Sequence, residues 1–396
     1  MALTLDAAKW RKKRGMKRLL AALGAEEGLT RFVGGAVRDD LLGLPVSDVD
    51  LATRIPPQEV MQRLEKARIK AVPTGIEHGT ITAVSDAQPF EVTTLRRDVS
   101  TDGRRATVAF TDDWKEDAAR RDFTINALSA DPLTGELFDY FGGLRDLERR
   151  HVRFIGDPLQ RIAEDHLRIL RFFRFHARFD GGDPDAPALR ACTERANDLM
   201  ALSRERIADE LLKLLAISNP ASTVAIMLGH GILRPVLPEI VPDHIARLRA
   251  LIGAEEEAGI EAQPLRRLAS LIPDNRTLAE DIAARLRLSN KARRRLASAA
   301  ERSLDESPFA LAYRIGVDFA VDRLLLAGLS SDAALIEGWH KPRLPIGGGS
   351  LIDRGIPEGP IVARTLREIE NSWVLAGFPT GEKFEAIVQK AIDRAF

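Results

Sequence analysis

The chain has 396 residues, 45% hydrophobic and 29% charged, which is enough apolar material for a sizeable core and for two to four domains. Basic and acidic side chains number 58 each, so the formal net charge is zero. A nucleic-acid partner would therefore have to bind a local basic face, because the protein as a whole has no excess of positive charge.

The cysteine content and the N-terminus favour a cytoplasmic protein without a membrane partner. No stretch approaches the roughly 20 consecutive apolar residues that a membrane helix needs. The basic segment from Lys9 to Arg18 is followed by no apolar run of the kind that makes a secretion signal. The only cysteine, Cys192, excludes an intramolecular disulfide and a cysteine-based zinc cluster, as is typical of a reducing compartment.

The chain has two parts that differ in their residue patterns. Residues 1–155 mix short apolar runs with Gly, Asp and Thr, which predicts strands interleaved with helices. From residue 156 on, helical spacing dominates, with breaks at residues 181–187, 219–220 and 341–360, and we expect segments 156–220, 221–310 and 311–396. The sequence predicts an α+β protein in which a head with a mixed sheet precedes an all-helical neck, body and tail.

The segment RFVGGAVRDDLLGLPVSDVDLAT, residues 31–53, predicts a phosphate-binding turn. An apolar strand ends before Gly34 and Gly35, which let the backbone turn tightly and approach a ligand. A helix then begins, and its unpaired N–H groups favour an anion. Arg38, one turn into that helix, could add a charged fork to the same phosphates.

Two aspartates follow that helix at strand spacing. Asp48 and Asp50 are two residues apart in an apolar context, so period-two geometry places both carboxylates on one face. Paired hard oxygen ligands are what two Mg²⁺ ions need for phosphoryl transfer. Taken alone, either motif could be an ordinary glycine turn or a pair of solvated loop aspartates. The order strand, double glycine, helix with an arginine and paired aspartates favours a nucleotide-binding site with metal ligands.

With these motifs the chain resembles the class II tRNA nucleotidyltransferase and bacterial poly(A) polymerase family, within the DNA polymerase beta-type superfamily. GGAVRD and DVD match its first motif. The resemblance implies that Asp48 and Asp50 bind two Mg²⁺ ions and that a third carboxylate stands on a neighbouring strand. Glu91 in PFEVTTL is the candidate, and a surface glutamate at a strand edge is its alternative.

Further segments of the head strengthen the resemblance. RRDFTINAL, residues 120–128, is similar to the second motif, which implies that Arg121 and Asp122 contact the nucleotide. DYFGGLRDL, residues 139–147, is similar to the third motif, which links head to neck, and a simple loop is its alternative. TGIEHGTITAV resembles the CCA-adding branch. The charged stretch between Leu95 and Arg120, which contains Gly103, predicts a mobile loop of the kind that full CCA enzymes keep.

The segment RIAEDHLRILRFFRFHARF, residues 161–179, predicts one helix with a charged face, and Asp165 close to Arg168. A solvated face is the ordinary interpretation of such a pattern. It also resembles the family's fourth motif, EDxxRxxR, which implies that Asp165 and Arg168 read the Watson–Crick edge of the incoming base. A carboxylate accepts from the exocyclic amine that C and A share, and an arginine donates to a ring nitrogen or carbonyl. Arg171 and Arg174 could hold the triphosphate or order the neck.

The remaining motifs belong to the neck, body and tail. SRERIADEL, residues 203–211, is similar to the fifth motif, which supports the fourth. The basic stretch at residues 286–303 could lie along an RNA backbone, and an exposed helix face is equally compatible with it. Residues 345–366 resemble the tail of CCA-adding enzymes.

The resemblance implies an enzyme that adds C, C and A to the 3′ end of tRNA, using CTP and ATP and releasing pyrophosphate. Three alternatives stay open at this point: a poly(A) polymerase, an enzyme restricted to CC or to A, and a non-catalytic RNA-binding protein on a retired transferase fold. The sequence does not define an oligomeric state.

Overall fold

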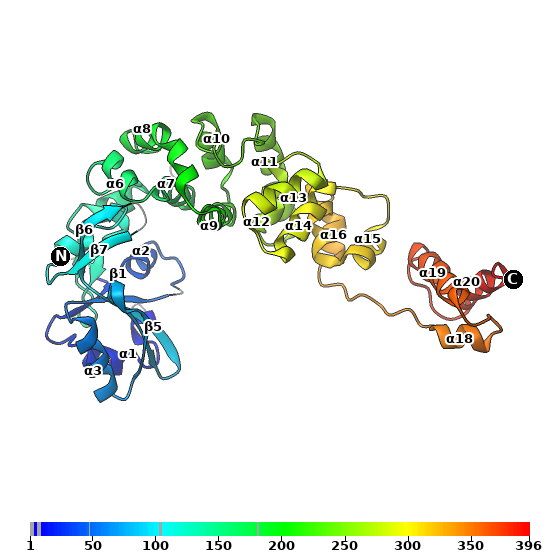
Figure 1. Cartoon of the computed structure of the whole chain (residues 1–396), viewed down its shortest axis with the longest axis horizontal. Coiled ribbons are helices and arrows are strands. Elements are labelled where there is room, and N and C mark those ends of the chain that lie inside the picture. The colour runs from blue at the N-terminus through cyan, green and yellow to red at the C-terminus, as the bar shows by residue number, and fades with distance from the viewer. Residues whose placement is uncertain (1–3, 6–8, 47, 103–104, 180–181) are drawn as a thin grey trace. The chain divides into compact units, whose positions relative to one another are not determined.

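The computed structural model describes residues 4–5, 9–46, 48–102, 105–179 and 182–396 (Figure 1). The chain divides into two compact units, one made of Met1–Glu210 with Gly229–Val236 and the other of Leu211–Leu228 with Leu237–Phe396. All strands of the described chain lie before residue 139, and only helices follow them. This order confirms the predicted α+β class. Among the described residues, no helix is both long and apolar enough to cross a membrane.

The head is built on a seven-stranded sheet in the order β3-β4-β5-β2-β1-β8-β9. The strands of the described chain are β1 Thr30–Val33, β2 Asp50–Thr53, β3 Lys70–Gly75, β4 Thr80–Ser85, β5 Gln88–Thr94, β6 Arg96–Asp102, β7 Arg105–Phe110, β8 Ser129–Ala130 and β9 Leu137–Phe138. The β2–β5 pair is parallel and the other pairs are antiparallel, which confirms the predicted mixed sheet.

The centre of this sheet brings chemistry-bearing residues together. In the register of β2, Asp50 pairs with Val33 of β1 on one side and with Glu91 of β5 on the other. Directly paired residues point to the same face of a sheet, so the carboxylates of Asp50 and Glu91 lie side by side. The turn at Gly34 follows Val33 and therefore lies at the same end of the sheet.

The helices of the first 220 residues cover the sheet and form the neck (Figure 1). They are α1 Met16–Ala22, α2 Gly35–Leu41, α3 Pro57–Lys66, α4 Trp114–Ala119, α5 Gly143–Glu148, α6 Pro158–Glu164, α7 Arg168–Arg178, α8 Ala186–Glu194 and α9 Arg204–Leu215, with short 3-10 turns at Lys9–Lys12, Ile76–His78, Thr124–Asn126 and Ala196–Ala201. Buried aromatic rings join α7 to the head, because Phe172 lies 6.3 Å from Phe123 and 5.9 Å from Phe154 between ring centroids.

Two local predictions were wrong. The predicted single helix over residues 161–179 is interrupted: α6 ends at Glu164, Asp165 has extended backbone angles (φ −152°, ψ 105°), and α7 begins at Arg168. The Asp165 carboxylate accepts a hydrogen bond from the Leu167 amide at 3.1 Å, and such local bonding lets aspartate compete with the helix for backbone donors.

The predicted loop between Leu95 and Arg120 is instead largely regular. Its described residues form the hairpin β6–β7 and helix α4, while Gly103 lies outside the described residues. Alternating β-branched and small residues in RATVAF favour a strand more than the charges favour a loop.

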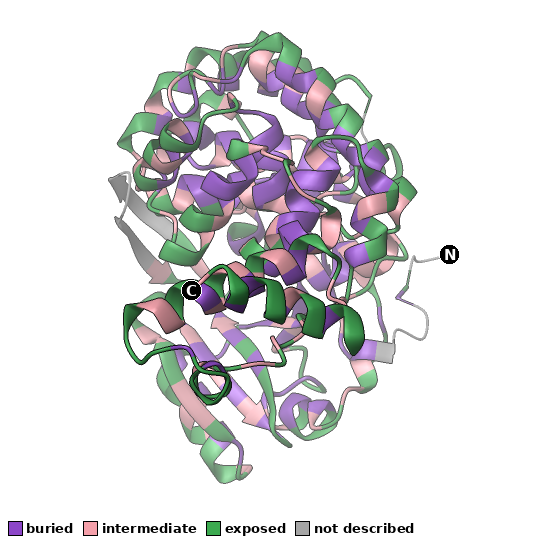
Figure 2. Cartoon of the chain, turned by 90° about the vertical axis from the view of Figure 1, so that its right-hand side faces the viewer, coloured by how far each residue is buried: buried purple, intermediate pink, exposed green. Residues whose placement is uncertain are grey.

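The second half of the chain is helical throughout its described residues. Its helices are α10 Ala221–Gly229, α11 Pro242–Ala258, α12 Pro264–Ser270, α13 Arg276–Arg285, α14 Asn290–Glu301, α15 Pro308–Ile315, α16 Val317–Leu326, α17 Ser330–Ile336, α18 Gly348–Asp353, α19 Pro360–Leu375 and α20 Glu382–Asp393. Some of these helices, such as α12 and α16, are buried at consecutive positions, whereas others have both buried and exposed residues (Figure 2). Around Trp373, the C-terminal helices share a separate apolar cluster.

A charged network is buried within this helical body. The side chain of Arg266, 1% exposed, donates to Glu255 at 2.8 Å and to Asp322 at 3.3 Å. Asp322 is fully buried and also accepts from Arg295 at 2.6 Å. Arg267 pairs with the same Glu255 and donates to the Leu215 carbonyl at 2.9 Å. These groups are out of water, so each depends on its partner.

We expect Asp322→Ala to lower the free energy of unfolding by about 3–5 kcal/mol, since it leaves buried arginines without their carboxylate. The exposed pair of Arg354 and Glu385 provides the control. There, Glu385→Ala is expected to cost at most about 1 kcal/mol. Urea denaturation followed by helical circular dichroism measures both, and equal losses would contradict the buried role.

Candidate active site

A pocket of about 420 Å³ opens in the first unit, where the head meets the neck helices. It is lined by Gly34, Gly35, Arg38, Asp50, Arg121, Asp122, Asn126, Asp165, Arg168, Arg171 and Phe175. Nine of these residues are sequence-predicted site residues. The predicted residues Asp48, Glu91 and Arg174 are not part of this lining, and their positions are described below.

The glycine turn forms one wall of the pocket. Gly34 has φ 67° and ψ −122°, a conformation that L side chains rarely adopt, and a Cβ there would lie 2.9 Å from Nη1 of Arg121. The Gly34 amide donates to the Leu128 carbonyl at 3.1 Å, which fixes the turn against the neighbouring strand. Helix α2 begins at Gly35, so its first amides and Arg38 point toward the pocket region.

The carboxylates form a second wall. Asp50 begins β2, Glu91 lies beside it on β5, and Asp48 precedes it by two residues. Burial, together with the negative charges of Glu91 and Asp48, raises the pKa of Asp50, and Arg121 offsets part of this effect. The three groups are therefore close enough to repel one another, and a cation between them would relieve the repulsion.

This donor set fits Mg²⁺, which prefers oxygen ligands. Across the described ranges, no group of three or more His, Cys, Asp or Glu side chains forms a complete metal cage. That arrangement is usual for Mg²⁺ sites that take one or two carboxylates from the protein and further oxygens from a bound triphosphate.

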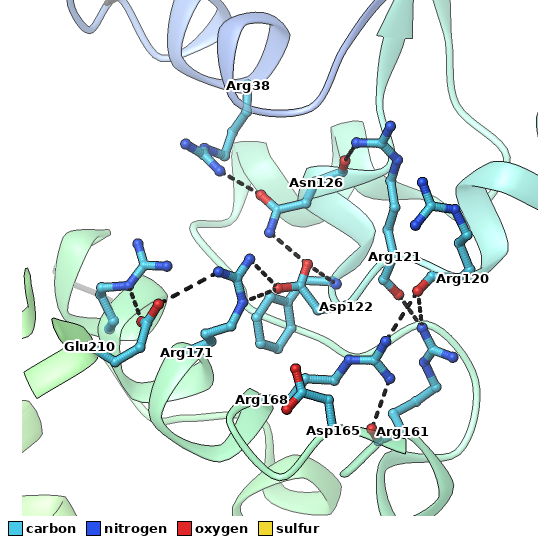
Figure 3. Close-up of polar contacts among 12 residues, drawn as sticks. Arg38, Arg120, Arg121, Asp122, Asn126, Arg161, Asp165, Arg168, Arg171 and Glu210 are labelled. Carbon is cyan, nitrogen blue, oxygen red and sulfur yellow. Dashed lines mark hydrogen bonds and ion pairs between the residues drawn. The ribbon is translucent and has the colours of Figure 1, made fainter. Parts of the chain in front are cut away.

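A series of polar contacts among residues that line the pocket links the head to the neck (Figure 3). Arg38 donates to Oδ1 of Asn126 at 2.5 Å, and the Asn126 amide donates to Asp122 at 2.8 Å. Arg171 of α7 donates to Oδ2 of Asp122 at 2.7 Å. Glu210 of α9 continues the chain, since it accepts from Arg174 at 2.6 Å and lies 3.7 Å from Arg171.

The pKa of Asp122 depends on its burial and on its partners. Burial alone would raise the pKa of Asp122, but the charge of Arg171 and hydrogen bonds from Asn126, Arg171 and the Phe123 amide outweigh it and lower the pKa. Asp122 is thus a buried carboxylate whose acceptor capacity is used within the protein. Arg174 faces Glu210, not the pocket, and Arg171 both lines the pocket and holds Asp122.

The residues predicted to read the base enter the pocket from the interruption between α6 and α7. Asp165 is bound by Nη2 of Arg206, at 3.1 and 2.9 Å from its two oxygens. Arg168 donates to Glu164 at 2.6 Å and to the carbonyls of Arg161 at 2.8 Å and Arg120 at 3.2 Å (Figure 3). The predicted closeness of Asp165 and Arg168 does not amount to an ion pair, because the broken helix turns each toward a different partner.

Four further residues of the site were not singled out from the sequence: Asn126, Phe175, Arg206 and Glu210. Asn126 lies within RRDFTINAL, and Arg206 and Glu210 lie within SRERIADEL, so both motifs carried a usable signal. Phe175 had none, since its place on the helix is that of a core residue. Its ring packs under three guanidinium groups, with Arg174 at 4.5 Å, Arg38 at 4.9 Å and Arg171 at 5.6 Å from the ring centroid.

Comparison with known proteins agrees with this geometry. Residues 30–153 match the family described as "Poly A polymerase head domain", and residues 185–243 match "Probable RNA and SrmB- binding site of polymerase A". The CCA tRNA nucleotidyltransferase 1, mitochondrial, of Mus musculus is 35% identical over 392 residues, which cover 92% of this chain and 87% of the mouse protein. The CCA-adding enzyme of Streptococcus gordonii is 34% identical, covering 88% and 90%.

A solved structure shows the same architecture. The CCA-adding enzyme of Bacillus stearothermophilus in complex with CTP superposes with a TM-score of 0.75 at 25% identity, and the alignment covers 96% of this chain and 99% of that one. A polymerase-type head followed by helices places the chain in the class of RNA nucleotidyltransferases. Within that class, its near full-length similarity shows that it belongs to the CCA tRNA nucleotidyltransferase family. The predicted family is confirmed.

The glycine turn can be tested with a matched pair of substitutions. Gly34 and Gly28 have nearly the same φ, 67° and 68°, but only at Gly34 would a Cβ meet a neighbour. We expect both alanine variants to lose about 1 kcal/mol or more of stability from the positive φ, so stability is measured for each of them. Only Gly34→Ala displaces Arg121, and we expect its KM for CTP to rise about tenfold, equivalent to roughly 1.4 kcal/mol. Equal KM values for the two variants would contradict a role for the turn.

The lowered pKa of Asp122 makes its contribution to stability depend on pH. Because the folded pKa lies below the unfolded value of about 3.9, the contribution is complete above that value and disappears as pH falls through the folded pKa. We expect Asp122→Asn to cost roughly 3 kcal/mol at pH 7, with the difference shrinking below about pH 4. Urea denaturation across this range measures it, and a constant difference would disprove the ion pair.

Proposed function

We propose that this protein adds C, C and A in turn to the 3′ end of tRNA from CTP and ATP. The observation that carries this proposal is one pocket lined at once by the glycine turn, the strand carboxylate and the residues of the helix interruption. The 3′-hydroxyl oxygen of the RNA would bond to the α-phosphorus of the nucleotide, whose bond to the pyrophosphate oxygen breaks. The mouse relative's name and the CTP complex of the Bacillus enzyme support this substrate set.

The carboxylates would hold the metal. Asp48 and Asp50 are the proposed ligands of two Mg²⁺ ions, and Glu91 is the third catalytic carboxylate beside them. When bound, the ions would supply Lewis-acid stabilisation of the charge that develops on the triphosphate. The pKa of Asp50 is raised first by burial and then by the charges of Glu91 and Asp48, and a bound cation would offset both effects, which supports this assignment.

The glycine turn and two arginines would seat the triphosphate. Gly34 and Gly35 clear space for phosphate oxygens beside the start of α2, and Arg38 adds positive charge. Arg121 suits a phosphate because its own hydrogen bonds are long, 3.4 Å to the Asn126 carbonyl and 3.3 Å to Asp117. A guanidinium held this weakly can turn to a ligand without losing a strong partner.

Base selection would fall to the residues at the helix interruption. Asp165 is 32% exposed and is held from behind by Arg206, so its carboxylate can accept from an exocyclic amine. Arg168 is anchored to backbone carbonyls and would donate to the ring. Cytosine and adenine both carry that amine, whereas uracil and guanine carry a carbonyl there.

Asp122, Arg171 and Arg174 would contribute to nucleotide binding mainly by positioning. Asp122 and Arg171 join the turn-bearing head to α7, and Arg174 fixes Glu210. Asp122 and Arg171 each line the pocket as well as holding one another, whereas Arg174 is not part of the lining.

We also propose the cytoplasm as the compartment, on the strength of the single cysteine. Cys192 is buried, and burial raises the pKa of its thiol, which makes it unreactive. The vertebrate relatives carry mitochondrial names, so expression of a fluorescent fusion is the direct check.

The central experiment measures nucleotide addition on tRNA ending at each of its three successive stages. We expect C, C and A to be added in order, and Asp50→Asn to lower the rate roughly a thousandfold or more, because it removes a ligand worth several kcal/mol in the transition state. Asp86→Asn, an exposed site in the β4–β5 turn, is the control and should keep the wild-type rate.

Other outcomes would select other functions. Long tails from ATP alone would identify a poly(A) polymerase, and arrest after CC or a requirement for CC would identify a restricted enzyme. Failure to release pyrophosphate with any tRNA would support an RNA-binding protein without catalysis.

A further inference from the structure

A second cationic pocket lies beside α5 in the first unit and shares no residue with the nucleotide pocket. Its volume is about 430 Å³, and it is lined by Gly142, Arg145, Asp146, Arg149, His151 and Arg153. Gly142, Arg145 and Asp146 lie within the motif DYFGGLRDL, the other three residues follow it, and the mechanism proposed above uses none of the six.

The backbone of α5 explains how the cations converge. Arg145 and Arg149 are one turn apart, since the Arg149 amide donates to the Arg145 carbonyl at 3.2 Å. Arg150 then adopts a positive φ of 54°, and the His151 amide returns to the Asp146 carbonyl at 2.8 Å. This tight turn brings the following segment back along the same side of the helix.

The other polar groups of the pocket are already engaged. Asp146 is buried and accepts from Thr124 at 2.6 Å and from Arg153 at 2.8 Å, and Arg153 also donates to the Phe141 carbonyl at 3.0 Å. The ring of His151 is held by Asp185 at 3.0 Å. The first amides of α5 are capped by Asp139 and so do not attract a ligand.

Arg145 and Arg149 differ from these neighbours. Both are exposed, and within the part of the chain that the structure describes neither side chain has an ion pair or a hydrogen bond. The lining of the pocket thus has two guanidinium groups without a partner and a carboxylate that is already paired. Planar guanidinium forks bind phosphate oxygens in a bidentate manner, which makes phosphate the anion that this pocket suits.

We propose that this pocket binds a backbone phosphate of the RNA substrate, with Arg145 and Arg149 as the contacting residues. The inference rests on the proposed function, which makes RNA the long anionic ligand of this protein. Thr124 connects the site to the active site, because it bonds Asp146 and begins the short helix that carries Asn126. A phosphate bound here would hold the RNA to the same unit that binds the nucleotide.

The test is direct binding of tRNA that lacks its terminal CCA, measured without nucleotide over a series of salt concentrations. We expect Arg145→Ala/Arg149→Ala to weaken binding at least about fivefold and to reduce the slope of log K against log salt by about 1 to 2. Arg145→Lys/Arg149→Lys keeps the charges and is expected to restore most of the slope. The KM for CTP on saturating tRNA should not change.

The control is Lys66→Ala/Lys70→Ala, which removes two exposed positive charges from α3 and β3. Equal losses in both double variants would overturn the proposal, since only general electrostatics would then be at work. An unchanged slope with a lowered melting temperature would also overturn it and assign the arginines to helix stability. If the variant instead lowers only the affinity for inorganic pyrophosphate, the pocket takes a free anion and the RNA assignment is wrong.

The binding assay separates this inference from the proposed function. A wild-type protein that binds tRNA through these arginines but adds no nucleotide leaves the inference standing and removes the proposed function. If the Arg145→Ala/Arg149→Ala variant binds tRNA as the wild type does, and the wild type adds C, C and A, the inference is wrong and the proposed function stands.

Discussion

The architecture around the site depends on the ion pair between the buried Asp122 of the head and Arg171 of the neck. Its two groups come from segments 49 residues apart, and the charge of Asp122 depends on Arg171 because Asp122 is out of water. Asn126 and Arg38 extend the pair into the glycine turn, and Glu210 extends it into α9. The nucleotide pocket is the space that this chain of contacts leaves between head and neck.

Electrostatics divides the pocket into functionally different walls. The lining includes the carboxylate of Asp50, with Glu91 and Asp48 close enough to raise its pKa further, and the guanidinium groups of Arg38, Arg121 and Arg171. A nucleoside triphosphate with its metal ions carries both signs of charge and matches both sides. Arg174 and Arg161 donate to Glu210 and to backbone carbonyls, and neither of them lines the pocket, so their role is structural.

Much of the fold and of the site could be predicted from local pattern. The pattern of the sequence predicted the strand that begins at Asp50 and the turn at the double glycine, because each depends only on near neighbours in the chain, whereas Asp48 lies before that strand. The partnership of Asp165 with Arg206 could not be found this way. It depends on a helix interruption that one aspartate causes, and on a contact across 41 residues. Phe175 was missed for a similar reason, since only the folded structure shows which face of α7 meets Arg38.

The parallel pairing of β2 with β5 determines which mutations would disturb the arrangement of the catalytic carboxylates. The relative position of Asp50 and Glu91 is determined by backbone register, which continues from Asp50↔Glu91 to Thr53↔Thr94. Side-chain substitutions nearby leave this register intact. A one-residue insertion or deletion within either strand would turn every following side chain to the opposite face. The backbone pairing of four residues in each strand therefore sets the separation of the two carboxylates. The neighbouring side chains can vary as long as no residue is gained or lost.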